Sequence, residues 1–173
     1  MKRHITMAIG MALLLCVGAS SAWSAPTSGD AGVRAFAERV VRSLNDTSNK
    51  PTDWEHLSRR GGYDPSLIRL MDENNRLAQG VDLLDSDPLC QCQDTGGHYV
   101  LSALSQTDPD DATASIAQAG QPVTAVLKRT GGAWHVYDVI DASGSLRARL
   151  IHHNKCMRTY KTDAAQVKCF GDS

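Results

Sequence analysis

A chain of 173 residues is long enough for one domain with its own hydrophobic core, but short for two. Apolar residues make up 42% of it and charged residues 21%, both ordinary for a globular protein. The formal net charge is −1 and there is no lysine- or arginine-rich run, so no nucleic-acid partner is expected.

The beginning of the chain has the layout of a secretory signal peptide. A basic start at residues 2–4 precedes an apolar run at 5–17 and small residues at 18–22. The apolar run is short for a membrane span, so no stable membrane insertion is expected. We predict cleavage after Ser24, with cleavage after Ala22 as the alternative. Cleavage after Ser24 leaves 16 basic and 19 acidic side chains, a net charge of −3.

Cys16 allows a second interpretation of this leader, in which a lipid anchors the chain. Three leucines precede the cysteine, whereas the lipid-attachment motif requires a small residue just before it. We therefore predict a released periplasmic protein rather than a lipoprotein.

Four cysteines remain after the leader: Cys90, Cys92, Cys156 and Cys169. An even number of cysteines in an exported chain predicts disulfides, and four cysteines allow three pairings. A zinc site is the weaker alternative, because the spacing lacks paired C-x₂-C motifs. No metal and no other cofactor is expected.

The first predicted helix shows one apolar stripe with the period of an α-helix, formed by Val33, Phe36, Ala37, Val40, Val41 and Leu44. Ser28 or Asp30 is expected to cap its start. The polar run at 45–49 ends the helix, and Pro51 prevents its continuation.

The second predicted helix begins with Asp64 as N-cap and Pro65 as first helical residue. Its packing stripe is expected to contain Leu67, Ile68, Met71, Asn75 and Ala78. The helix should end near Gly80. The following stretch, up to Asp94, is rich in aspartate.

The second half of the chain has the pattern of an antiparallel sheet. Strands are predicted at 98–104, 112–119, 122–129 and 133–141, with Gly131-Gly132 as a tight hairpin turn. In the last strand, strict alternation places Trp134, Val136, Asp138 and Ile140 on the core face, and His135, Tyr137 and Val139 on the other.

A third helix is predicted from a cap at Ser143 or Ser145 to about His152, followed by a tail at 154–173 with little core signal. Helices followed by an antiparallel meander indicate a single α+β domain over 25–173. We expect the helices to lie across one face of the sheet, because its apolar face has nothing else to cover it.

Three pieces of the sequence carry a family resemblance: DPLCQCQD at 87–94, GAWHVYDV at 132–139 and SLRARL at 145–150. Together they resemble an uncharacterised family of exported bacterial domains, some of them lipoproteins. That family is thought to share the cone-shaped α+β fold of nuclear transport factor two-like proteins. The resemblance runs from the first helix to Leu150. It implies a fold and a location in the cell envelope, and no catalytic residue.

The resemblance also bears on the disulfides, because it includes the Cys-x-Cys stretch and not the tail. It implies a local Cys156–Cys169 bond and a separate Cys90–Cys92 pair or dithiol. Pairing of the Cys-x-Cys stretch with the tail remains the alternative. A redox-active Cys90–Cys92 pair is a sharper possibility, but no helix N-terminus is predicted nearby to stabilise a thiolate.

Asp138 is the candidate acid or base. An aspartate on a core face needs a partner, and Arg147 in the following helix is the candidate for a structural ion pair. The alternative is a pocket carboxylate in a cone-fold enzyme or small-molecule binder. Adjacent histidines at 152 and 153 diverge on a helix and make a poor metal clamp.

The predicted function is a non-catalytic periplasmic binding or inhibitor module with a protein partner, which includes an immunity protein that neutralises a secreted toxin. No nucleophile–base motif occurs in the sequence. The candidate binding residues are Asp82, Asp85, Asp87 and Asp94, because loops on a rigid scaffold carry recognition and acidic loops suit basic partners.

Overall fold

The computed structural model describes residues 28–45, 62–78, 83–84, 88–89, 98–118 and 121–171. The elements in chain order are α1 (Ser28–Asn45), α3 (Pro65–Ala78), β1 (Tyr99–Gln106), β2 (Asp111–Gln118), β3 (Gln121–Thr130), β4 (Ala133–Asp141), β5 (Gly144–Ser145), α4 (Leu146–Thr159) and α5 (Asp163–Phe170). The five strands form one antiparallel sheet in the order β1-β2-β3-β4-β5. The predicted α+β class is confirmed for the described part of the chain.

The hairpin between β3 and β4 follows directly from its two glycines. Gly131 and Gly132 have φ angles of 61° and 83°, which are strained for residues with a side chain. Two successive positive φ angles are what a two-residue hairpin turn requires. The turn predicted from the Gly-Gly pair is confirmed.

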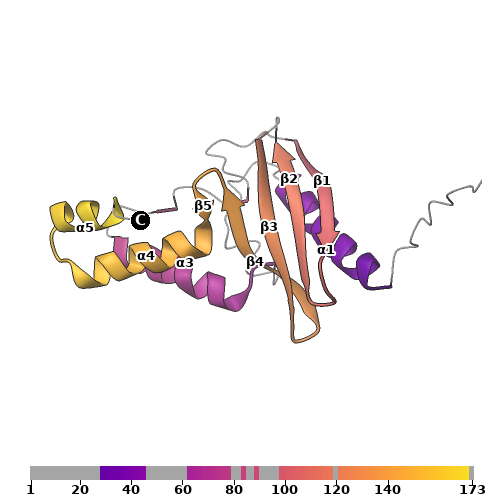
Figure 1. The fold of residues 1–173 in the computed structure, drawn as a ribbon, viewed down its shortest axis with the longest axis horizontal. Helices are drawn as coiled ribbons and strands as arrows, with labels where there is room; N and C mark the ends of the chain where they lie inside the picture. The colour runs from indigo at the N-terminus through magenta and orange to yellow at the C-terminus, as the bar shows by residue number, and fades with distance from the viewer. Residues whose placement is uncertain are drawn as a thin grey trace, which may run out of the picture.

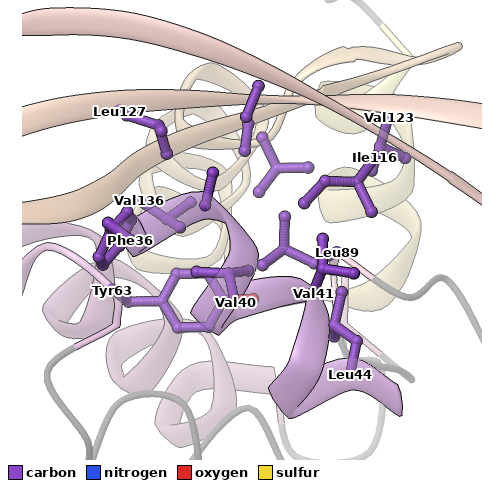
Figure 2. Close-up of a cluster of buried hydrophobic side chains, with 14 of the residues drawn as sticks. Phe36, Val40, Val41, Leu44, Tyr63, Leu89, Ile116, Val123, Leu127 and Val136 are labelled. Atoms are coloured by element: carbon purple, nitrogen blue, oxygen red, sulfur yellow. The ribbon is translucent and has the colours of Figure 1, made fainter. Parts of the chain in front are cut away.

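Helix α1 lies across one face of the sheet (Figure 1), and six of its side chains belong to the hydrophobic core. Figure 2 shows the side chains that meet there, which include Phe36, Val40, Val41 and Leu44 of the helix and Ile116, Val123, Leu127 and Val136 of the sheet. Asn45 fixes the end of the helix, because its side chain donates to and accepts from the backbone of Tyr99, both at 2.8 Å. The amphipathic stripe predicted for this helix is confirmed.

A β-bulge at Tyr137 changes which residues of β4 face the core. Leu127 of β3 pairs with Val136, and its neighbour Val126 pairs with Asp138. Tyr137 is therefore an extra residue of β4 between Val136 and Asp138. Beyond the bulge Val139 is 1% exposed and Ile140 is 41% exposed. The predicted alternation is therefore wrong after Val136. By register, Asp138 lies on the sheet face of Val126, opposite the face that carries Val136 and Val139.

Helices α3 and α4 pack against each other beside the β4–β5 end of the sheet, so the expectation that all helices lie across one face is wrong (Figure 1). The start of α3 is held to β4 by two backbone hydrogen bonds, from Val136 to Gly62 (2.7 Å) and from Asp64 to Val136 (2.9 Å). The predicted start of this helix, with Asp64 before Pro65, is confirmed.

The contact between α3 and α4 contains buried polar side chains that hydropathy does not detect. Asn74, rather than the expected Asn75, faces inward and donates to Asn154 and to Nδ1 of His153, both at 2.9 Å. Asn154 in turn donates to the carbonyl of Leu70 at 3.0 Å. Hydrogen bonding satisfies these buried groups, so they pack as well as apolar ones.

The polar core explains why α4 is longer than predicted. The helix runs on to Thr159, and Cys156 and Met157 are buried with Asn154 in what was expected to be a tail with little core signal. A short helix, α5, follows it. Within the described residues no helix combines the length and the apolar character needed to cross a membrane.

Candidate functional site

The side chain of Asp138 sits at the N-terminus of α4 and is buried there. Its Oδ1 accepts hydrogen bonds from the backbone N–H groups of Val139 (2.8 Å) and Arg147 (2.9 Å). Its Oδ2 accepts one from the hydroxyl of Ser145 at 2.6 Å. Three donors thus hold the carboxylate in one orientation.

Ser145 and Asp138 together cap α4. The Ser145 hydroxyl accepts from the backbone N–H of Ala148 at 3.0 Å, which makes Ser145, not Ser143, the N-cap residue. Asp138 accepts a hydrogen bond from the backbone N–H of Arg147, which lies one residue before Ala148 in the helix. A negative charge at this position also interacts favourably with the positive end of the helix dipole. The positive charge that compensates Asp138 is therefore the partial charge of the helix N-terminus.

The side chain of Arg147 contacts residues at the start of α3 and Tyr137 of β4. Its Nε and Nη2 both donate to the carbonyl of Tyr137, at 2.9 and 2.7 Å, and its guanidinium lies 3.8 Å from the centre of the Tyr137 ring. Its Nη1 donates to Ser66 at 3.0 Å, and Nη2 lies 3.5 Å from Oδ1 of Asp64.

The predicted side-chain ion pair between Asp138 and Arg147 is therefore wrong. Within the described residues, the carboxylate at ion-pair distance from the guanidinium is that of Asp64. The bulge gives the reason, because it directs Asp138 toward the helix N-terminus, where backbone donors occupy it. The two residues do join α4 to the sheet, but through the backbone of Arg147. We call Asp64, Ser66, Asp138, Ser145 and Arg147 the cap cluster.

The cap cluster alters the acidity of Asp64. Burial alone raises the pKa of this carboxyl, but the hydroxyl and backbone N–H of Ser66, together with the Arg147 charge, outweigh burial and hold the pKa below its usual value. Such an arrangement keeps a carboxylate ionised at neutral pH. It suits a structural anion better than a general acid or base, which needs a pKa near the working pH.

The lowered pKa predicts how acid affects stability. Because the pKa of Asp64 is lower in the folded chain than its ordinary value of 3.8, the ionised carboxylate stabilises the fold above that value, and this contribution is lost as the pH falls further. Asp64→Asn should therefore lose less unfolding free energy than the wild type between about pH 5 and about pH 2, measured by urea denaturation.

The comparison with the wild type is essential, because the pKa of Asp108 is also lowered, first by the backbone N–H of Asp110. Asp108 is present in both proteins, so the difference between the two curves isolates Asp64. Equal slopes for the wild type and Asp64→Asn would contradict the role given to Asp64.

A second cluster of reactive side chains joins α4 to α5. Cys156 and Cys169 form a disulfide with their Cα atoms 5.9 Å apart, which confirms the local pairing expected for the tail. Nε2 of His152 lies 3.4 Å from Sγ of Cys156 and 2.9 Å from the carbonyl oxygen of Cys169. Within the described residues these three side chains form a group that could hold a metal, but the disulfide uses both thiolates that a metal would need.

The adjacent histidines point to different partners, as expected for neighbours on a helix. His152 faces the disulfide. The ring of His153 stacks on Phe170 of α5 at 3.9 Å and interacts with Asn74 of α3. His153 and Asn74 make buried structural contacts that the sequence analysis missed. Isolated polar residues carry no periodic signal that would have identified them.

The remaining candidate residues lie outside the described residues. These are Cys90, Cys92, Asp82, Asp85, Asp87 and Asp94. The pairing predicted for the two cysteines and the binding role predicted for the aspartates stay predictions.

Leucines within the same stretch are described and are anchored. Leu89 is buried in the core, and Leu83 and Leu84 are partly buried against it (Figure 2 shows Leu89). The backbone N–H of Leu83 also donates to Oδ1 of Asn74 at 3.1 Å. The aspartate-rich stretch is thus tied to the domain at several points.

Comparison with known proteins adds no assignment, since no protein-family model and no curated protein matches the chain. The resemblance carried by the three sequence pieces therefore stays a prediction, as does the cone-shaped fold that it implies.

Proposed function

We propose that this protein is a non-catalytic binding module of the periplasm whose partner is a protein with a basic surface, such as a secreted toxin that it neutralises. The aspartate-rich stretch at 82–94 is the proposed contact. The Cys156–Cys169 disulfide supports export, because disulfides persist mainly in oxidising compartments.

The observation that carries this proposal is the anchoring of the stretch by its leucines. Leu83, Leu84 and Leu89 pack against the core, and Asp82, Asp85 and Asp87 lie next to or between them in the sequence. Burial of Leu84 and Leu89 holds the chain on either side of Asp85 and Asp87. A loop tied to a rigid scaffold in this way loses little conformational entropy when it binds a partner.

The state of Asp138 favours binding over catalysis. Two backbone N–H groups and one hydroxyl already use its carboxylate, and α4 depends on them for its cap. An acid or base must be reached by its substrate, whereas this carboxylate is buried and three of its four lone-pair positions already accept hydrogen bonds. The competing function, an enzyme or small-molecule binder that uses Asp138, therefore gains no support from this geometry.

The other aspartate-rich segment, between β1 and β2, has its charges already compensated. Asp111 lies 3.0 Å from Nζ of Lys128, and Asp110 lies 3.7 Å from Nε of Arg129. Oδ1 of Asp108 accepts two backbone N–H groups within the turn. This segment stabilises its own turn, which leaves the stretch at 82–94 as the better candidate for a basic partner.

The test replaces Asp82, Asp85 and Asp87 together with asparagine. We expect the variant to fold as stably as the wild type, within about 0.5 kcal/mol, because surface substitutions cost little. Its capture of a partner from periplasmic extract should fall at least about tenfold, and wild-type capture should weaken as salt is added, since screening removes charge attraction.

A matched control removes the same charge elsewhere. Glu38, Asp72 and Asp163 lie at exposed positions of α1, α3 and α5, and replacing Glu38 with glutamine and the two aspartates with asparagine should leave capture unchanged. Equal capture by the variant of the 82–94 stretch and by the control variant would contradict the proposal. Loss of a measurable turnover in a well-folded Asp138→Asn variant would establish the enzyme instead.

A further inference from the structure

The C-terminal helix α5 is attached to the rest of the protein by few contacts. None of its residues is buried, although Phe170 and Cys169 are half-buried. Its contacts include the Cys156–Cys169 disulfide, the hydrogen bond from His152 to the Cys169 carbonyl, the stacking of Phe170 on His153 and the hydrogen bond from Gln166 to the carbonyl of Tyr160. The disulfide is the covalent bond among these contacts, so its chemistry bears on whether α5 stays docked.

The two cysteines of this disulfide are not equally exposed. Cys156 lies within α4 and is 1% exposed, whereas Cys169 near the end of α5 is half-buried. Thiol–disulfide exchange needs an attacking thiolate to reach one sulfur, while the other sulfur leaves. Access therefore selects Cys169 as the sulfur attacked and Cys156 as the leaving group.

A buried thiolate is costly unless a donor stabilises it, and His152 supplies the donor. The imidazole lies one helical turn before Cys156, and its Nε2 is in contact with both Sγ of Cys156 and the carbonyl oxygen of Cys169. A carbonyl only accepts hydrogen bonds, so Nε2 carries the hydrogen. That hydrogen is already next to the sulfur on which negative charge would develop.

We propose that Cys156–Cys169 is an exchangeable disulfide and that a small thiol or dithiol reductant is its substrate. The reductant thiolate attacks Sγ of Cys169 and forms a mixed disulfide there. The electron pair of the broken S–S bond goes to Sγ of Cys156, where the Nε2–H of His152 stabilises the thiolate until it takes a proton from water. A second reductant thiolate then attacks the reductant sulfur of the mixed disulfide, so that the reductant leaves as a disulfide and Cys169 leaves as a thiolate, which also takes a proton from water.

Reduction would leave α5 joined to α4 by the short loop at 160–162 and docked by non-covalent contacts. These include the stacking of Phe170 on His153 and the hydrogen bonds from His152 and Gln166, on an eight-residue helix that has no buried side chain. Isolated helices of this length are not stable in water. Release of α5 would uncover the face of α4 that carries His152, His153 and Cys156.

The experiment treats the purified, oxidised protein with excess glutathione, quenches samples with acid and maps the modified cysteines by mass spectrometry after blocking free thiols. The first product should carry glutathione on Cys169 and a free thiol on Cys156. His152→Leu should slow the reduction about tenfold, because leucine has no N–H to stabilise the Cys156 thiolate, the effect of losing one charge-assisted hydrogen bond. The substitution also removes the hydrogen bond to the Cys169 carbonyl, so the docking of α5 is checked in the variant.

Lys155→Gln is the matched control, because it removes an exposed cation next to Cys156 and leaves the imidazole in place. Its rate should stay within about twofold of the wild type. Hydrogen exchange of the oxidised variants reports whether α5 remains docked. A His152→Leu protein that keeps α5 docked and reacts as fast as the wild type would overturn the proposal.

The position of the mixed disulfide is an independent test that requires no variant. Glutathione found first on Cys156 of the wild type would contradict the proposed direction of attack. If hydrogen exchange shows that His152→Leu loosens α5, this mapping on the wild type decides the matter alone.

Discussion

Arg147→Met should lower the free energy of unfolding by about 3 kcal/mol, the lower end of what breaking a buried ion pair costs. The Arg147 side chain is 14% exposed and that of Asp64 is 9% exposed, so solvent compensates little of the loss. The substitution leaves Asp64 without its counter-charge and removes two donors from the carbonyl of Tyr137. Urea denaturation at neutral pH measures the difference.

Arg69→Met is the control, since Arg69 is exposed on α3 and its replacement should change stability by less than about 0.5 kcal/mol. Combining Asp64→Asn with Arg147→Met should cost less than the sum of the single variants, because each removes the same interaction. A loss for Arg147→Met no larger than that for Arg69→Met would mean that the cap cluster does not hold α4 to the sheet.

The second large effect separates two adjacent residues of β4. Val139→Thr should destabilise the protein by about 2 kcal/mol, because it buries a hydroxyl in nearly the same volume without a hydrogen-bond partner. Ile140→Thr should cost less than about 1 kcal/mol, because Ile140 is 41% exposed. The two unfolding curves, measured side by side, test the register that the bulge at Tyr137 creates.

Strict alternation along β4 predicts the opposite order, with Ile140 on the core face and Val139 outside. A greater loss of stability for Ile140→Thr than for Val139→Thr would therefore show that β4 has no bulge at Tyr137 and that Asp138 lies on the core face. That outcome would also reopen the role of Asp138, since its three hydrogen bonds depend on the turned strand.

The cap cluster lies at the start of α4, and the group of His152, Cys156 and Cys169 lies toward the end of this helix. The two groups have different roles. At its start, Asp138 and Ser145 fix the helix to β4, and Arg147 extends the connection to α3. Near its end, His152 and Cys156 connect it to α5, which has little other support. The first cluster makes α4 part of the rigid scaffold, and the second provides the site for the proposed exchange.

Local signals in the sequence predicted much of the fold. The stripe from Val33 to Leu44 identified α1, and Asp64-Pro65 identified the start of α3, because helix period and capping depend on neighbouring residues. Gly131-Gly132 identified the hairpin, since few other pairs adopt two positive φ angles. These features need no knowledge of distant contacts.

Only the tertiary structure decided which side chains meet across the chain. The bulge at Tyr137 arises from pairing with β3, and it exchanged the positions of Val139 and Ile140 without any local signal. Asn74 is buried because Asn154 and His153 satisfy it from another helix, so its polarity misleads a hydropathy pattern. The sequence by itself thus determined α1, the start of α3 and the β3–β4 hairpin, whose causes lie within a few residues. The full length of α4, helix α5 and the partners of Asp138, Arg147 and His152 depended on contacts that only folding creates.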